Sequence, residues 1–174
     1  MTTMGRDYFL DVKPPDGDAR TAALSLVLPR GSSAGPFLAS YARRHLYSPG
    51  APDRYVLTGA QWNGFMEELY AQESLIRALA DCVVSVFDFD PDVPDKIREP
   101  QPEDWQKLAR FEQWVIRVFG HSADGSPEPV FSLETEHFRR GVIWAWDLSH
   151  WLELDPEIRA ALRDTQNLVF LDIG

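Results

Sequence analysis

The stretch VFDFDPDVPD carries four aspartates, Asp88, Asp90, Asp92 and Asp95. Carboxylates this close together could bind a metal ion, transfer protons or form an acidic surface. A calcium-binding loop takes oxygen ligands at positions one, three, five and twelve and needs glycine at position six. The spacing from Asp88 to Glu99 supplies these ligands, but Val93 stands at the glycine position and prolines interrupt the backbone path. The sequence therefore favours solvated carboxylates or an interaction surface over a calcium site.

A second set of candidate residues contains histidine. Asp147, His150 and Glu153 are spaced by three residues, so on a helix they would lie along one side. Another group consists of Glu134, Glu136 and His137. Zinc needs several such ligands to converge, and neither spacing matches an established zinc motif. We expect no metal and no cofactor; if the chain is an enzyme, Asp147, His150 and Glu153 are its best acid–base candidates.

No motif in the sequence specifies a reaction. The chain contains no nucleophile elbow GxSxG, no phosphate-binding GxxxxGK[ST] and no dinucleotide-binding GxGxxG. Its single cysteine, Cys82, lies in the apolar run CVVSVF, which is typical of a buried thiol and of a reducing compartment. We find no secretory signal pattern, and no window approaches the roughly 18 apolar residues of a membrane span. These features predict a cytoplasmic protein with no membrane partner.

Negative charge is concentrated in the second half of the chain. The formal net charge is -10; residues 1–87 hold eight basic and nine acidic side chains, whereas residues 88–174 hold nine and eighteen. Such a surface repels phosphate backbones, so nucleic-acid binding is disfavoured outside the arginine doublets at 43–44 and 139–140. It attracts basic proteins over long range and speeds their association. The charge therefore predicts a basic protein partner.

Hydrophobic periodicity predicts a single α+β domain spanning residues 1–174, with a mainly antiparallel or mixed sheet and several helices packed on it. Residues 7–13 and 21–28 alternate between apolar and polar and flank the turn sequence PPDGD, as in a hairpin. Helical spacing begins at the capping box of Thr58 and Gln61 and can continue to Leu79 after a break near Ser74. A second helix is predicted over residues 102–119, closed by Gly120.

The remaining segments are shorter. VVSVFDFD, PVFSLE, GVIWAW and the terminal NLVFLDI are predicted to be strands, and DLSHWLEL fits helix or strand. Asp155 followed by Pro156 predicts the start of a short helix, PEIRAALRD. Alternation in GVIWAW places Trp144 and Trp146 in the core. Trp151 is the tryptophan of this group that we expect to be partly exposed and available to a partner.

Three functions fit these features. In size, composition and charge, the chain resembles the small acidic immunity proteins that protect bacteria from toxins. That resemblance implies an inhibitor that occludes a basic active site. The placement of charge predicts Asp88, Asp90, Asp92, Asp95 and Glu99 as partner-binding residues, together with the aromatic Trp151. The alternatives are a small hydrolase-like enzyme that uses Asp147, His150 and Glu153, and an adaptor subunit of a larger assembly.

Overall fold

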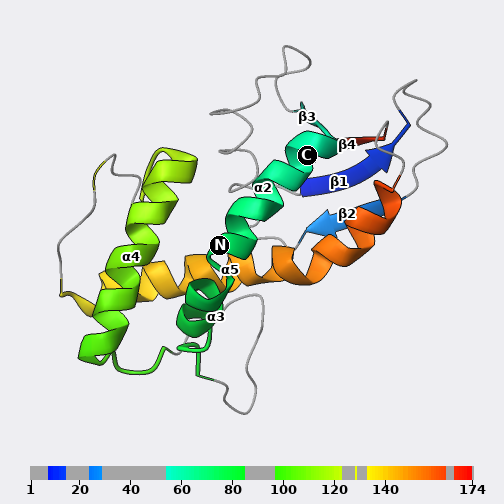
Figure 1. Cartoon of the computed structure of the whole chain (residues 1–174). Coiled ribbons are helices and arrows are strands. Elements are labelled where there is room, and N and C mark those ends of the chain that lie inside the picture. Colours follow the sequence, from blue (N-terminus) through cyan, green and yellow to red (C-terminus); the bar gives the residue numbers. More distant parts are fainter. Residues whose placement is uncertain are drawn as a thin grey trace.

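The computed structural model describes residues 8–14, 24–28, 54–84, 97–122, 128, 133–163 and 167–173. Figure 1 shows its elements, which are β1 (Tyr8–Lys13), β2 (Leu24–Leu28), β3 (Arg54–Thr58), α2 (Gly59–Ala71), α3 (Glu73–Ala80), α4 (Pro102–Phe119), α5 (Thr135–Ala161) and β4 (Leu168–Ile173). Within these residues the arrangement is α+β with an antiparallel sheet, as the sequence predicts.

The described strands form one sheet in the order β2-β1-β4-β3. The predicted hairpin is confirmed by the pairing of β1 with β2, with Leu10 opposite Leu26. The predicted terminal strand, β4, lies between β1 and β3 and pairs with both. Strand β3 was not predicted, because its five residues give little periodicity and its partner lies at the other end of the chain. Leu10 and Val12 enter the core, whereas Phe9 is exposed on the other face.

Helices α2 and α4 begin and end where local signals predict. The hydroxyl of Thr58 accepts a hydrogen bond of 3.2 Å from the amide of Gln61, whose side chain accepts one of 2.8 Å from the Thr58 amide. Helix α2 ends at Gln72, and α3 continues the predicted pattern. Helix α4 ends at Gly120, whose φ of 90° is in the left-handed region that glycine tolerates. The start of α2 is therefore set by two side chains within one turn, and the end of α4 by the backbone conformation of Gly120.

Helix α5 overturns two predictions. GVIWAW is helical rather than a strand, and Asp155 lies inside the helix rather than at its start. Its buried side chains recur every three or four residues; they include Phe138, Val142, Ala145, Leu148, Trp151, Leu152, Asp155 and Ile158. This longer period outweighs the short alternation of GVIWAW. Pro156 is accommodated inside the helix.

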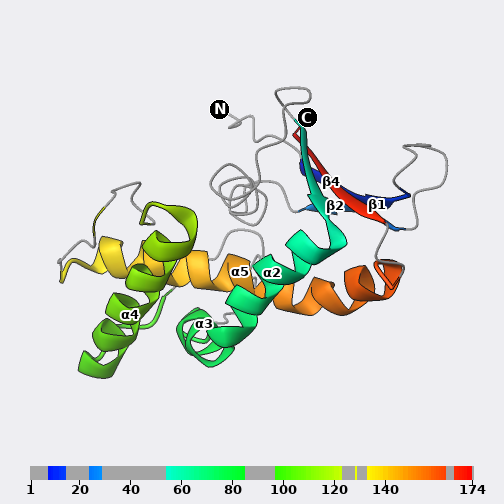
Figure 2. The ribbon, with the colours of Figure 1, turned by 45° about the horizontal axis from the view of Figure 1, so that its top comes forward.

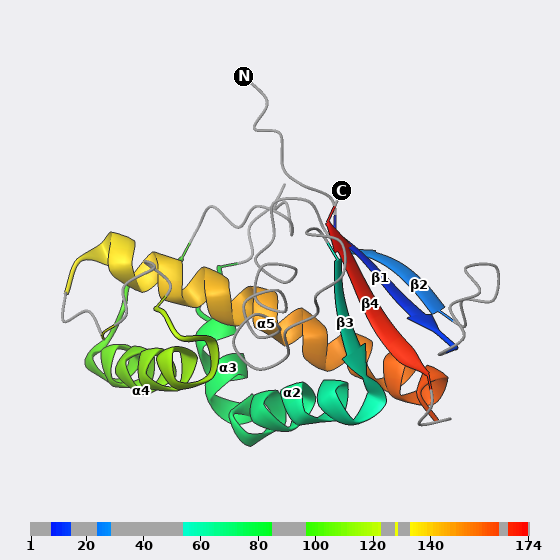
Figure 3. The ribbon, with the colours of Figure 1, turned by 90° about the horizontal axis from the view of Figure 1, so that it is seen from above.

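The helices and the sheet share one apolar core. Helix α5 runs along the molecule, with the sheet toward its C-terminal end and α4 crossing near its N-terminal end (Figure 2). Helix α2 lies between these regions and packs on β3 and β4 (Figure 3). No helix within the described residues has the length and apolar character needed to cross a lipid bilayer.

Several predictions fall on residues that are not described. They concern residues 85–90 of the strand in VVSVFDFD, the helix in FLASYARRHLY and most of PVFSLE. The part of VVSVFDFD that is described contains only a single bridge, at Val83. Leu133 and Glu134, at the end of PVFSLE, precede α5 without forming a strand.

Candidate partner-binding site

The two ends of the aspartate-bearing segment are held together. Val83 and Ile97 form an antiparallel bridge, and the amide of Arg98 donates a hydrogen bond of 2.9 Å to the carbonyl of Cys82. Residues 85–96 between them contain Asp88, Asp90, Asp92 and Asp95 and are not described. The described residues on the two sides of this segment therefore meet at one place, between the end of α3 and the start of α4.

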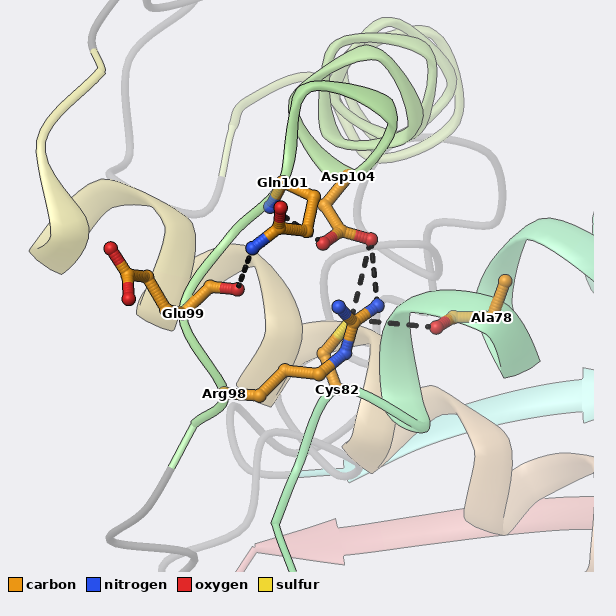
Figure 4. Close-up of polar contacts among 6 residues, drawn as sticks. All are labelled: Ala78, Cys82, Arg98, Glu99, Gln101 and Asp104. Atoms are coloured by element: carbon orange, nitrogen blue, oxygen red, sulfur yellow. Dashed lines mark hydrogen bonds and ion pairs between the residues drawn. The ribbon is translucent and has the colours of Figure 1, made fainter.

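A buried carboxylate holds the place where Cys82 and Val83 meet Ile97 and Arg98 (Figure 4). Asp104, in the first turn of α4, is 2% exposed; its Oδ1 lies 2.8 Å from a terminal nitrogen of Arg98. Its Oδ2 accepts a hydrogen bond of 2.8 Å from the backbone amide of Gln101, which completes a capping box. A carboxylate at this position also interacts favourably with the positive end of the helix dipole. Asp104 therefore fixes both the start of α4 and the position of Arg98.

Cys82 belongs to the same group of contacts as Arg98 and Asp104. Its thiol is buried and lies 3.9 Å from Asp104 Oδ1 and 3.6 Å from the carbonyl of Ala78 (Figure 4). Burial raises the pKa of the Cys82 thiol; the Arg98 guanidinium opposes this rise, the negative charge of Asp104 adds to it, and the pKa stays above its ordinary value. A raised pKa keeps the thiol protonated, so it acts as a weak hydrogen-bond donor rather than as a nucleophile.

Glu99 is the one predicted partner-binding carboxylate among the described residues. It is exposed, and its side chain points away from the Arg98–Asp104 pair (Figure 4). Its carbonyl accepts a hydrogen bond of 3.4 Å from the side chain of Gln101. Glu99 thus presents its charge to solvent two residues after Ile97, which forms the bridge to Val83.

The expectation that Trp151 is partly exposed is wrong. Its side chain is fully buried in α5. Its ring packs edge-on against Trp62, with centroids 5.6 Å apart, and against Phe65 at 6.1 Å. Such aromatic pairs stabilise the core beyond the burial of their area. Trp151 therefore offers no surface to a partner in this conformation.

The acid–base candidates on α5 face different surroundings. Asp147 is buried, His150 is half-buried and Glu153 is exposed. The ring of His150 packs edge-on against Trp146, with centroids 4.4 Å apart. Helical spacing therefore aligns the three residues along α5, but they pass from a buried to an exposed position.

His137 has a partner that the sequence did not indicate. Its Nε2 lies 3.1 Å from Oε1 of Glu112 on α4, and both side chains are buried. The neighbours Glu134 and Glu136 are exposed instead, and Glu136 pairs with the doublet Arg139–Arg140. Within the described residues, no three His, Cys, Asp or Glu side chains converge as metal ligands.

Asp155 forms a second buried site that sequence reasoning missed. Its Oδ1 accepts a hydrogen bond of 3.2 Å from the indole of Trp62, and its Oδ2 accepts one of 2.7 Å from the hydroxyl of Tyr70. Arg159 Nε lies 2.6 Å from the same Oδ2. The spacing of Asp155 and Arg159 was the available signal, because opposite charges four residues apart meet on a helix.

No protein-family model, curated protein or solved structure matches this chain.

Proposed function

We propose that the chain is an acidic protein-binding module, and within that class an immunity-type inhibitor that occludes the basic active site of a toxin or nuclease-like effector. The observation that carries this proposal is the net charge of -10. The Arg98–Asp104 and Arg159–Asp155 pairs are each neutral, so this excess stays on the rest of the chain. A surface of this sign accelerates association with a basic partner.

The position of the aspartates supports the same proposal. The segment 85–96 contains Asp88, Asp90, Asp92 and Asp95. It is flanked by the Val83–Ile97 bridge and by the Arg98–Asp104 pair. The described residues at both ends of this segment are thus anchored beside the start of α4. Glu99, which is exposed, adds a further negative charge next to Arg98.

The test measures association with an effector encoded beside this chain's gene, at low and moderate salt. The variant changes all four aspartates, Asp88, Asp90, Asp92 and Asp95, to asparagine. We expect its association rate constant to fall by about tenfold at low salt and its salt dependence to flatten, because steering charges act mainly on encounter. The wild-type chain should also abolish the effector's activity at a one-to-one ratio.

A matched control separates position from total charge. It changes four exposed carboxylates elsewhere to glutamine: Glu103, Glu134, Glu153 and Glu157. Both variants lose four negative charges, so a position-specific role requires the aspartate variant to associate more slowly than the control. Equal rates would contradict the role of the segment. A wild-type chain that leaves the effector active would contradict the inhibitor function.

A further inference from the structure

A hollow of about 360 Å³ lies at the seam between α2 and α5. It is lined by Asn63 and Glu67 of α2, by Arg159 of α5 and by Leu162, which follows α5. Its volume is at the lower end of the range for small-molecule sites. It adjoins the Asp155 site, because Arg159 belongs to both.

Two contacts, with Asp155 and with the ring of Tyr70, hold the side chain of Arg159 in place. Its Nε contacts Asp155 Oδ2, and Asp155 is fully buried. Its guanidinium carbon lies 4.9 Å from the centre of the Tyr70 ring, within the distance of a cation–π interaction. Because Nε is taken by Asp155, the planar group leaves its terminal nitrogens for another acceptor. A guanidinium fixed in this way is suited to a carboxylate.

The α2 wall of the hollow carries the opposite charge. Asn63 and Glu67 are four residues apart, so they lie on the same face of the helix, and both are exposed. Glu67 and Arg159 line the same hollow, yet no ion pair joins these two described residues. A positive group and a negative group are therefore held apart across one small space.

We propose that this hollow binds a zwitterion of the α-amino-acid class with an apolar side chain. The ligand carboxylate pairs with the terminal nitrogens of Arg159, and its ammonium group pairs with Glu67. The amide of Asn63 supplies a further polar contact, and Leu162 contacts the apolar side chain. The site does not depend on the proposed basic partner, because it uses none of the aspartates of residues 85–96.

The test is a titration with L-leucine, followed by nuclear magnetic resonance of the Asn63 side-chain amide and Arg159 Nε–H. Two probes each lack one charge: isocaproate has no ammonium group and isoamylamine has no carboxylate. We expect saturable shifts with leucine and binding at least about tenfold weaker for either probe, since each loses one charge-assisted contact.

Glu67→Gln separates this site from general charge effects. Glu67 is exposed and makes no polar contact with another described residue, so the variant should fold. It should weaken leucine binding by about tenfold and leave isocaproate binding unchanged. Glu103→Gln, which removes the same charge on α4, should change neither. The proposal is overturned if leucine gives no saturable shift, if isocaproate binds as tightly as leucine, or if Glu67→Gln binds leucine like the wild type.

Discussion

The carboxylate of Asp155 and the indole of Trp62 form a buried hydrogen bond, although 93 residues separate them in the sequence. The same carboxylate accepts a hydrogen bond from the hydroxyl of Tyr70 and pairs with Arg159. One side chain of α5 thus satisfies two donors of α2 and one cation of its own helix. Networks of this kind are stabilising when every member has a partner and costly when one is removed.

Asp155→Ala should lower the free energy of unfolding by about 3 kcal/mol, because it leaves the Trp62 indole without its acceptor and Arg159 without its carboxylate. Urea denaturation followed by tryptophan fluorescence measures this difference. Glu73→Ala is the control: it breaks an exposed pair with Arg77 and should cost less than about 1 kcal/mol. Similar losses in the two variants would show that the Asp155 contacts are not coupled into the core.

Gly141→Ala should destabilise the protein by about 1 kcal/mol, although alanine favours helix formation over glycine. A β-carbon at position 141 would overlap the end of the Leu108 side chain, which is buried in α4 and would have to shift. In a Leu108→Ala background the overlap is gone, so Gly141→Ala should become stabilising. A double-mutant cycle by chemical denaturation tests this change of sign. Additive effects would mean that α4 and α5 can separate at this crossing without cost.

Stability should decline at alkaline pH. Burial raises the pKa of Cys82 above 9.0, and burial together with the hydrogen bond to Asp155 raises the pKa of Tyr70 above 10.0. In the unfolded chain both groups lose their protons at lower pH than in the folded chain. Their contribution is therefore complete below about pH 9 and is lost as the pH rises through the folded pKa values.

The measurement is the free energy of unfolding between about pH 8 and pH 11. Cys82→Ala should remove the part of the decline that begins near the ordinary thiol pKa of 9.0. Tyr70→Phe should remove the part that begins near 10.0. If the free energy of unfolding falls with pH in both variants as steeply as in the wild type, the alkaline loss of stability belongs to other groups.

Local signals in the sequence determine the start of α2 and both ends of α4. Thr58 and Gln61 start α2, and Gly120 ends α4, because each acts on backbone groups within one turn. The hairpin of β1 and β2 is equally local, since alternation and a turn sequence suffice to predict it. Trp62, Phe65 and Phe111 are buried at the helical spacing by which the sequence predicts α2 and α4.

Tertiary contacts decided the rest. Asp155 and Pro156 look like a helix start, but the carboxylate is used by Trp62 and Tyr70 from another helix, so α5 continues through them. The burial of the acidic side chains could not be predicted from the sequence either. Asp104 and Asp155 are buried beside cations, whereas Glu99 is exposed, and nothing in a residue's type separates these cases. Burial depends on which distant segments fold against a side chain, and a carboxylate tolerates it only where donors and a positive charge converge on it.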